Sequence, residues 1–264
     1  MAYLTRRIVL AAGTATCLSS GAVAQDPTGE VRPEETEVWS PIPRVVMVPP
    51  AGPPTPAPSD AIVLFGDAGL EQWVSATDGS PAAWIVADGV LTVNKRAGDI
   101  RTRRSFRDFQ LHIEWRIPEG ITGEGQARGN SGLFLSTAGT GYELQILDSY
   151  RNETYVNGMA GSVYKQSIPL MNASRPPGAW QTYDVVWRAP RFDPNGALRS
   201  PARMTVFFNG ILVQDNFELL GETRYRGAPE YTPHEASPIL LQAHQDPSPP
   251  ISFRNIWLRE LTDS

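Results

Sequence analysis

Two tight-turn dipeptides, each inside a run of alternating apolar residues, constrain the fold more than any other feature. Asp-Gly at 88–89 interrupts the run 84–93, and Asn-Gly at 209–210 interrupts the run 204–213. Such dipeptides tolerate the positive φ angles of two-residue hairpin turns. The chain should therefore contain at least two antiparallel hairpins.

Further short segments alternate in the same way, and no stretch shows a sustained helical period with caps. Many short, aromatic-rich strands are typical of a two-sheet antiparallel sandwich. The sequence therefore predicts an all-β fold of this kind. The additional strands are expected at 109–116, 131–136, 142–148, 181–188, 239–244 and 251–258.

The first 24 residues have the pattern of an export signal. Arg6-Arg7 opens a basic region, an apolar stretch of small residues follows, and Ala22-Val23-Ala24 forms a cleavage site. The paired arginines also fit a twin-arginine signal, so the export route stays open between the general and the twin-arginine pathways. We expect a signal peptide at 1–24, no membrane span and a periplasmic or secreted protein.

The next segment, 25–59, is rich in proline and predicts an extended, mobile linker. The folded domain is then expected at 60–264. Cys17 is the only cysteine and lies in the signal, so the mature protein should have no disulfide and no cysteine-based site.

The formal net charge of the chain is −5, and no cluster of basic residues stands out. Nucleic acids and anionic membranes attract basic patches. Both are therefore excluded as expected partners, whereas the oligomeric state stays open.

The most informative strand for function is 141–150, because it carries ionisable side chains among apolar ones. Period-two alternation puts Glu143 and Gln145 on one face, and Tyr142 and Asp148 on the other with the aliphatic residues. A carboxylate on a mid-sheet face needs a partner or has a chemical use.

Three further places carry candidate polar groups. His112, Glu114 and Arg116 share one face of a strand, which fits either a solvated face or a sugar-binding face. The loop 128–132 brings Arg128 and Asn130 next to glycines that allow a close ligand approach.

Near the C-terminus, Gln242 and His244 share a strand face, and Arg254 lies on the last strand. Histidine titrates near neutrality and suits acid–base chemistry. Arg254 can hold a carboxylate, and a structural pair with Glu143 is one expectation for it.

Two familiar catalytic patterns are missing from the sequence. There is no Glu-x-Asp-x-x-Glu strand and no Gly-x-Ser-x-Gly elbow. Retaining glycosidases need two carboxyl groups about 5–5.5 Å apart, and the sequence gives no support for such a pair.

Taken in order, several segments resemble the 3-keto-disaccharide hydrolase domain family over about residues 60–262. The resemblance implies a concanavalin A-like jelly roll and cleavage of glycosides already oxidised at C3 of the sugar. One departure is the longer, proline-containing loop 245–250, which affects the expected substrate range. The matching segments are Leu64–Asp67, Gly69–Leu70 with Trp73, Gly129–Gly132, Tyr142–Asp148, Gly178–Asp184, Asn209–Gly210, Leu241–His244 and Phe253–Trp257.

A 3-keto group makes the C2 proton acidic, so elimination of the C1 substituent can precede addition of water. We expect Glu143 or His244 to be the base and Arg254 or Asn130 to contact the C3 oxygen. A divalent metal bound by Glu143 and His244 is a further hypothesis, although no compact ligand motif is present. Substrate binding is assigned to Asn130, Arg128, Tyr142, Gln145, Gln242, Asp148 and Glu114.

A carbohydrate-binding module without turnover is the main alternative, because one fold can host both uses. An exposed aromatic platform would favour the module, and a pocket of converging ionisable groups would favour the enzyme. A structural envelope protein is a third hypothesis, which leaves the polar strand faces unexplained.

Overall fold

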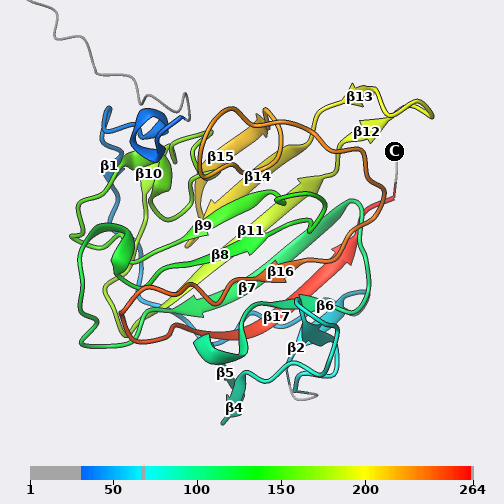
Figure 1. Cartoon of the computed structure of the whole chain (residues 1–264). Helices are drawn as coiled ribbons and strands as arrows, with labels where there is room; N and C mark the ends of the chain where they lie inside the picture. The colour runs from blue at the N-terminus through cyan, green and yellow to red at the C-terminus, as the bar shows by residue number, and fades with distance from the viewer. Residues whose placement is uncertain (1–30, 67–68, 263–264) are drawn as a thin grey trace, which may run out of the picture. The chain divides into compact units, whose positions relative to one another are not determined.

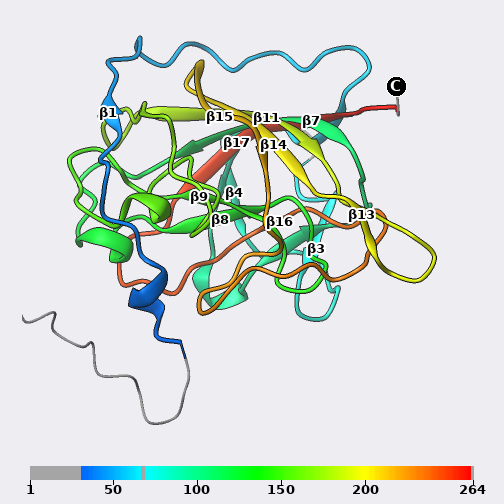
Figure 2. The ribbon, with the colours of Figure 1, turned by 90° about the horizontal axis from the view of Figure 1, so that it is seen from above.

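Two antiparallel sheets lie face to face in the computed structural model, which describes residues 31–66 and 69–262 (Figures 1 and 2). The two-sheet sandwich predicted from the alternating strands is therefore confirmed. The larger sheet runs in the order β15 (Ile211–Glu218), β14 (Arg203–Phe208), β11 (Trp180–Arg188), β7 (Phe109–Arg116), β17 (Ser252–Glu260), β5 (Val90–Thr92) and β4 (Ile85–Ala87), with β2 (Ile62–Phe65) also paired to β17.

The smaller sheet has five strands and carries the polar residues of interest. Its order is β3 (Trp73–Ser75), β6 (Ile100–Thr102), β16 (Leu240–Leu241), β8 (Ser131–Phe134) and β9 (Glu143–Ile146). Outside the two sheets lie the pairs β1 (Arg44–Val45) with β10 (Met171–Asn172) and β12 (Arg191–Phe192) with β13 (Leu198–Ser200), and the 3-10 helices η1 (Pro33–Thr36), η2 (Lys95–Ala97), η3 (Gly125–Ala127) and η4 (Val156–Gly158).

Both predicted hairpins form. Strand β4 pairs with β5, and β14 pairs with β15. The turn residues have positive φ, 50° and 71° at residues 88–89 and 52° and 81° at 209–210. These are the values that make Asp-Gly and Asn-Gly suitable there.

Large aromatic side chains fill the space between the sheets. Trp115 stacks on Phe208 with ring centroids 5.7 Å apart, and Tyr142 packs against Trp187 at 5.2 Å. These four side chains are no more than 1% exposed. With no cysteine in the domain, this core must supply the stability.

Of the segment 25–59, for which a mobile linker is expected, residues 25–30 lie outside the described residues and the rest is described. Residues 32–59, here called the N-terminal arm, belong to the same compact unit as the sandwich. The first part of the arm pairs β1 with β10 in parallel, and its last part runs along the outer face of the larger sheet (Figure 2). There Thr55 accepts a hydrogen bond from Asn255. Composition predicted the extended conformation of the arm but not the contacts that hold it.

The expected signal peptide lies outside the described residues. In the described part of the chain, no helix has the length and apolar character needed to cross a membrane.

Candidate active site

Strand β9 builds the centre of the site, because its two faces have different surroundings. Leu144 and Ile146 point into the core, whereas Glu143 and Gln145 line a cavity on the other side. The predicted alternation is therefore right for this strand. All four residues are buried, so Glu143 and Gln145 are polar groups held away from bulk water.

The cavity has a volume of about 790 Å³. Its wall combines carboxylates, carboxamides and a histidine with aromatic rings, as expected of a small-molecule site. Its lining residues include Glu37, Gln126, Asn130, Glu143, Gln145, Tyr155, Tyr164, Tyr225, Gln242, His244 and Asp246.

The Glu143 carboxylate is 6% exposed and accepts no hydrogen bond from the described residues. Burial raises its pKa to about 8. Gly132 on the paired strand β8 leaves the space for it, because a Cβ there would lie 2.6 Å from Glu143 Oε1. At neutral pH the group is mainly a protonated acid.

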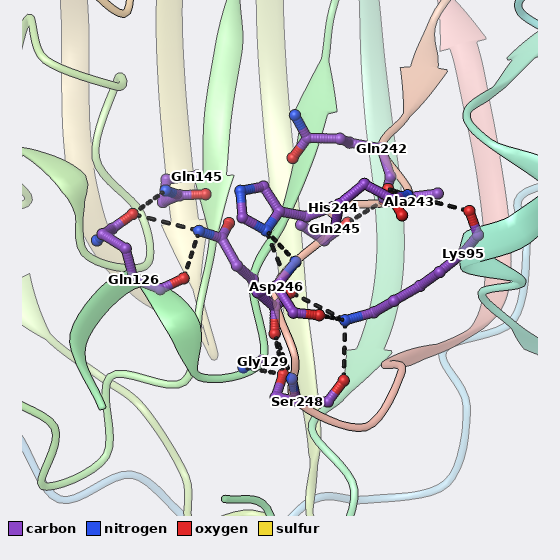
Figure 3. Close-up of polar contacts among 12 residues, drawn as sticks. Lys95, Gln126, Gly129, Gln145, Gln242, Ala243, His244, Gln245, Asp246 and Ser248 are labelled. Carbon is purple, nitrogen blue, oxygen red and sulfur yellow. Dashed lines mark hydrogen bonds and ion pairs between the residues drawn. The ribbon is translucent and has the colours of Figure 1, made fainter. Parts of the chain in front are cut away.

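His244 lies beside a buried carboxylate that fixes its orientation (Figure 3). His244 Nδ1 lies 3.1 Å from Asp246 Oδ2 and 3.2 Å from the Asp246 backbone nitrogen, so it either donates to the carboxylate or accepts from the backbone N–H, depending on the tautomer. Burial opposes ionisation of Asp246, but hydrogen bonds from His244, Ser248 and Lys95 lower its pKa to about 2. An ionised Asp246 favours the tautomer with the proton on Nδ1, which leaves Nε2 free to accept a proton.

Lys95 holds the loop that carries Asp246. Its ammonium donates to Asp246 Oδ2 at 3.0 Å, to the Asp246 carbonyl at 2.6 Å and to the Ser248 carbonyl at 2.8 Å (Figure 3). Ser248 in turn donates to Asp246 Oδ1 through its backbone nitrogen and its hydroxyl. The loop beside His244 is therefore tied by both charge and hydrogen bonds.

A group of carboxamides forms the neighbouring wall. Gln126 Oε1 accepts hydrogen bonds from Gln145 at 3.1 Å and from Asn130 at 3.3 Å (Figure 3). Two buried oxygens, Gln145 Oε1 and Gln242 Oε1, have no hydrogen-bond partner among the described residues. Such acceptors suit the hydroxyl hydrogens of a sugar.

Arg128 and Asp148 support this wall from behind. Arg128 Nε is 2.7 Å from Asp148 Oδ2, and the Asp148 backbone nitrogen donates to the Arg128 carbonyl. Neither residue lines the cavity. Their expected role in substrate binding is corrected to holding the loop that carries Asn130.

Tyr142 also has a different place from the one expected. It is fully buried in the core, and its hydroxyl lies 3.1 Å from His234. The strand alternation itself requires this, because Tyr142 and Glu143 are neighbours and must point to opposite faces.

Arg254 and Glu114 lie on the outer face of the larger sheet, on adjacent strands β17 and β7. Arg254 Nε donates to Glu114 at 2.6 Å, and its guanidinium lies 4.2 Å from the Trp180 ring centroid. The expected pair of Arg254 with Glu143 is therefore wrong. The core separates Arg254 and Glu114 from the cavity, and His112 belongs to the same outer network.

Glu143 and His244 are the hypothesised pair of metal ligands, and a metal site usually needs further ligands beside such a pair. The described residues contain no group of three or more His, Cys, Asp or Glu side chains placed to hold a metal ion.

With this geometry in view, comparison with known proteins assigns the family. The 3-keto-alpha-glucoside-1,2-lyase-like domain matches residues 60–259, most of the chain. The chain belongs to this family. The resemblance inferred from the sequence motifs is confirmed, and the family indicates a carbohydrate-active domain.

Solved structures agree with that assignment. One protein of Parabacteroides distasonis ATCC 8503, named a "putative glycosyl hydrolase", is 51% identical over 86% of this chain and 96% of its own, with a TM-score of 0.75. Two more of that name and organism are 18% and 21% identical, with TM-scores of 0.56 and 0.52. Both matches cover 76% of this chain, and they cover 94% and 99% of the two Parabacteroides proteins, respectively. At this identity they show a shared fold alone. No curated protein matches the chain.

Sequence reasoning missed several residues of the site in this family member. Lys95 and Asp246 are far apart in the chain, so no local motif contains both. Asp246 lies in the unusually long loop 245–250, whereas no sequence pattern points to Lys95. Gln126 had no motif around it. Glu37 precedes the region matched by the family, in the arm expected to be a linker.

Proposed function

We propose that the cavity cleaves glycosides whose sugar carries a ketone at C3. The observation that carries this proposal is Glu143, a buried carboxyl group that accepts no hydrogen bond from the described residues and lines the same cavity as His244. The Glu143 carboxyl group can donate a proton and the His244 imidazole can accept one, as an elimination requires.

In the proposed reaction, His244 Nε2 takes the proton from C2. The electrons of the C2–H bond form an enolate with the C3 ketone. Collapse of the enolate forms a C1–C2 double bond and breaks the bond from C1 to the leaving oxygen, which takes a proton from Glu143. Water then adds its oxygen to C1 and a proton to C2, so the sum is hydrolysis.

The buried amides bind rather than react in this scheme. Gln145 and Gln242 present acceptors for sugar hydroxyls, and protonated Glu143 needs no counter-ion. Asn130 uses its amide hydrogens on Gln126, so the Gln242 carboxamide is the better donor to the C3 oxygen. Asp246, held by Lys95, orients His244 in this scheme.

The decisive experiment compares a 3-keto-glucoside with its unoxidised parent, in ordinary water and in D₂O. We expect release of the aglycone from the oxidised substrate alone, with deuterium from D₂O at C2 of the sugar product. Equal turnover of the parent, or a C2 position that keeps its original hydrogen, would contradict the elimination. Binding of both sugars without turnover would favour the carbohydrate-binding alternative.

We also propose that the reaction takes place outside the cytoplasm. The support is the basic and apolar N-terminus with its Ala-x-Ala site at residues 22–24. Cell fractionation followed by N-terminal sequencing tests this, with Gln25 expected as the first residue of the exported protein.

A further inference from the structure

The cavity has a second end, which the proposed chemistry does not use. There the wall is formed by the rings of Tyr155, Tyr164 and Tyr225 and by the Glu37 carboxylate. Tyr155 and Tyr164 are nearly buried and share a hydroxyl hydrogen bond of 2.7 Å, whereas Tyr225 is 59% exposed. This end combines aromatic rings with a carboxylate, which can accept hydrogen bonds.

The N-terminal arm reaches this end through Asn157. The Asn157 side chain accepts a hydrogen bond from the Val38 backbone nitrogen and donates to the Thr36 carbonyl, both at 2.9 Å. The Val156 backbone nitrogen donates to the Val38 carbonyl at 2.7 Å. Since Asn157 is 3% exposed, these bonds fix the backbone on both sides of Glu37.

Lys165 connects the arm to the aromatic rings. Its ammonium donates to the Pro33 carbonyl at 2.7 Å and to the Tyr225 carbonyl at 3.0 Å. The same ammonium lies 4.8 Å from the Tyr225 ring centroid and 5.6 Å from that of Tyr155. The Lys165 ammonium therefore holds both the 3-10 helix that precedes Glu37 and the exposed Tyr225 ring.

This aromatic end adjoins the catalytic centre. The Tyr164 backbone nitrogen donates to the Glu143 carbonyl at 3.1 Å, so the rings begin next to the residue assigned to protonate the leaving oxygen. In the proposed direction of the substrate, the group attached to that oxygen extends toward the rings. An aromatic face with a nearby carboxylate matches a sugar ring, which has an apolar face and hydroxyl donors at its edge.

We propose that Glu37 and Tyr225 form a subsite for a second sugar ring, the leaving half of a disaccharide, and that the N-terminal arm thereby sets the substrate length. The inference rests on the proposed function for the direction of the substrate. It extends the site to a residue outside the region matched by the family, because Glu37 precedes residue 60.

The test measures binding of unoxidised sugars, which requires no turnover. The probes are maltose and methyl α-glucoside, titrated by calorimetry into the full-length protein and its variants. We expect the protein to bind maltose more tightly than methyl α-glucoside. Glu37→Gln should weaken maltose binding about fivefold and Tyr225→Ala about tenfold, because a charged acceptor and a stacking face are lost. Methyl α-glucoside should change less than twofold.

Two control variants separate the subsite from general effects. Glu34→Gln removes a charge from the 3-10 helix that precedes Glu37 without touching the cavity, and Tyr225→Phe keeps the ring. Both should bind maltose within twofold of the unmodified protein. Equal affinity for the two sugars, or equal losses for both in Glu37→Gln and Tyr225→Ala, would overturn the subsite. A protein that discriminates as expected but fails to cleave 3-keto-glycosides would keep the subsite and lose the proposed reaction.

Discussion

Glu143 and Glu114 are both buried glutamates on strands of the two facing sheets, Glu143 on the edge strand β9 and Glu114 on the central strand β7, yet their surroundings are opposite. Glu114 accepts hydrogen bonds from Arg254 at 2.6 Å, Asn255 at 2.8 Å and the Thr55 backbone at 3.2 Å. Glu143 accepts none from the described residues. Burial opposes ionisation of both, but the His112, Asn255 and Arg254 contacts lower the Glu114 pKa to about 2, whereas the Glu143 pKa rises to about 8.

The difference teaches how to tell a structural carboxylate from a reactive one in this fold. A partnered carboxylate stabilises the sheet and the arm that covers it. An unpartnered one costs stability and is useful only if a ligand meets it. Burial alone does not distinguish the two residues, since both are less than 10% exposed.

The largest expected effect is on turnover. Glu143→Gln keeps the shape of the side chain but removes its proton transfer, so kcat on a 3-keto-glycoside should fall by about 10²- to 10⁴-fold. The melting temperature should stay the same or rise, because a costly buried acid has been removed. Kinetics and thermal unfolding on one sample check both, and near-normal turnover would remove Glu143 from the mechanism.

The matching substitution on the other sheet should act on stability instead. Glu114→Gln leaves Arg254 without its counter-charge and should lower the free energy of unfolding by about 3 kcal/mol. Turnover per folded molecule should be unchanged, because the core separates Glu114 from the cavity. Urea unfolding measures the loss. A fall in kcat without loss of stability would mean that the Glu114 contacts on the outer face affect the cavity.

The pH dependence of the reaction tests the assignment of Glu143 as the acid. If its protonated form reacts, kcat/KM should fall about tenfold per pH unit above pH 8, where the carboxyl group ionises. If Glu143 is instead the base, kcat/KM should rise up to that pH. A profile on a 3-keto-glycoside from pH 6 to 10 distinguishes the two.

A smaller effect is expected at the residue that orients the base. Asp246→Asn keeps the size of the side chain but removes the charge that favours a proton on His244 Nδ1, so kcat should fall about tenfold with little change in KM. NMR of the His244 ring should show a shift in tautomer. An unchanged tautomer, or a change confined to KM, would leave Asp246 with a purely structural role.

The smallest expected effect is a difference between the Glu143 and Glu114 variants in how their stability depends on pH. Because the folded pKa of Glu143 is raised, its cost grows from pH 4.5 to 8, so the advantage of Glu143→Gln in melting temperature should increase over that range. Because the folded pKa of Glu114 is lowered, its contribution is fully present above pH 4.5 and is lost as pH falls toward 2. The deficit of Glu114→Gln should therefore shrink below pH 4.5. If the stability difference from the unmodified protein changed with pH in the same direction for both variants, the opposite pKa shifts of Glu143 and Glu114 would be contradicted.

The sequence predicted the sandwich and the centre of the site through local patterns. Turn dipeptides at 88–89 and 209–210 and the alternation around Glu143 depend only on neighbours in the chain, so they could be read directly. The partner of Arg254 could not, because it depends on which strands lie side by side, and β17 lies next to β7. The arm was hidden for the same reason: proline composition predicts an extended chain but not that Asn157, 119 residues away from Val38, will hold it.

The chain contains only two lysines, Lys95 and Lys165, and each uses its ammonium to fasten one wall of the cavity to backbone carbonyls. The reactivity of the two lysines therefore reports on whether each wall is in place. Acylation of Lys95 should be slow while the loop at 246–248 is closed, and acylation of Lys165 should be slow while the arm is docked. Mass spectrometry of the two modified peptides would follow each wall separately in the unlabelled, full-length protein.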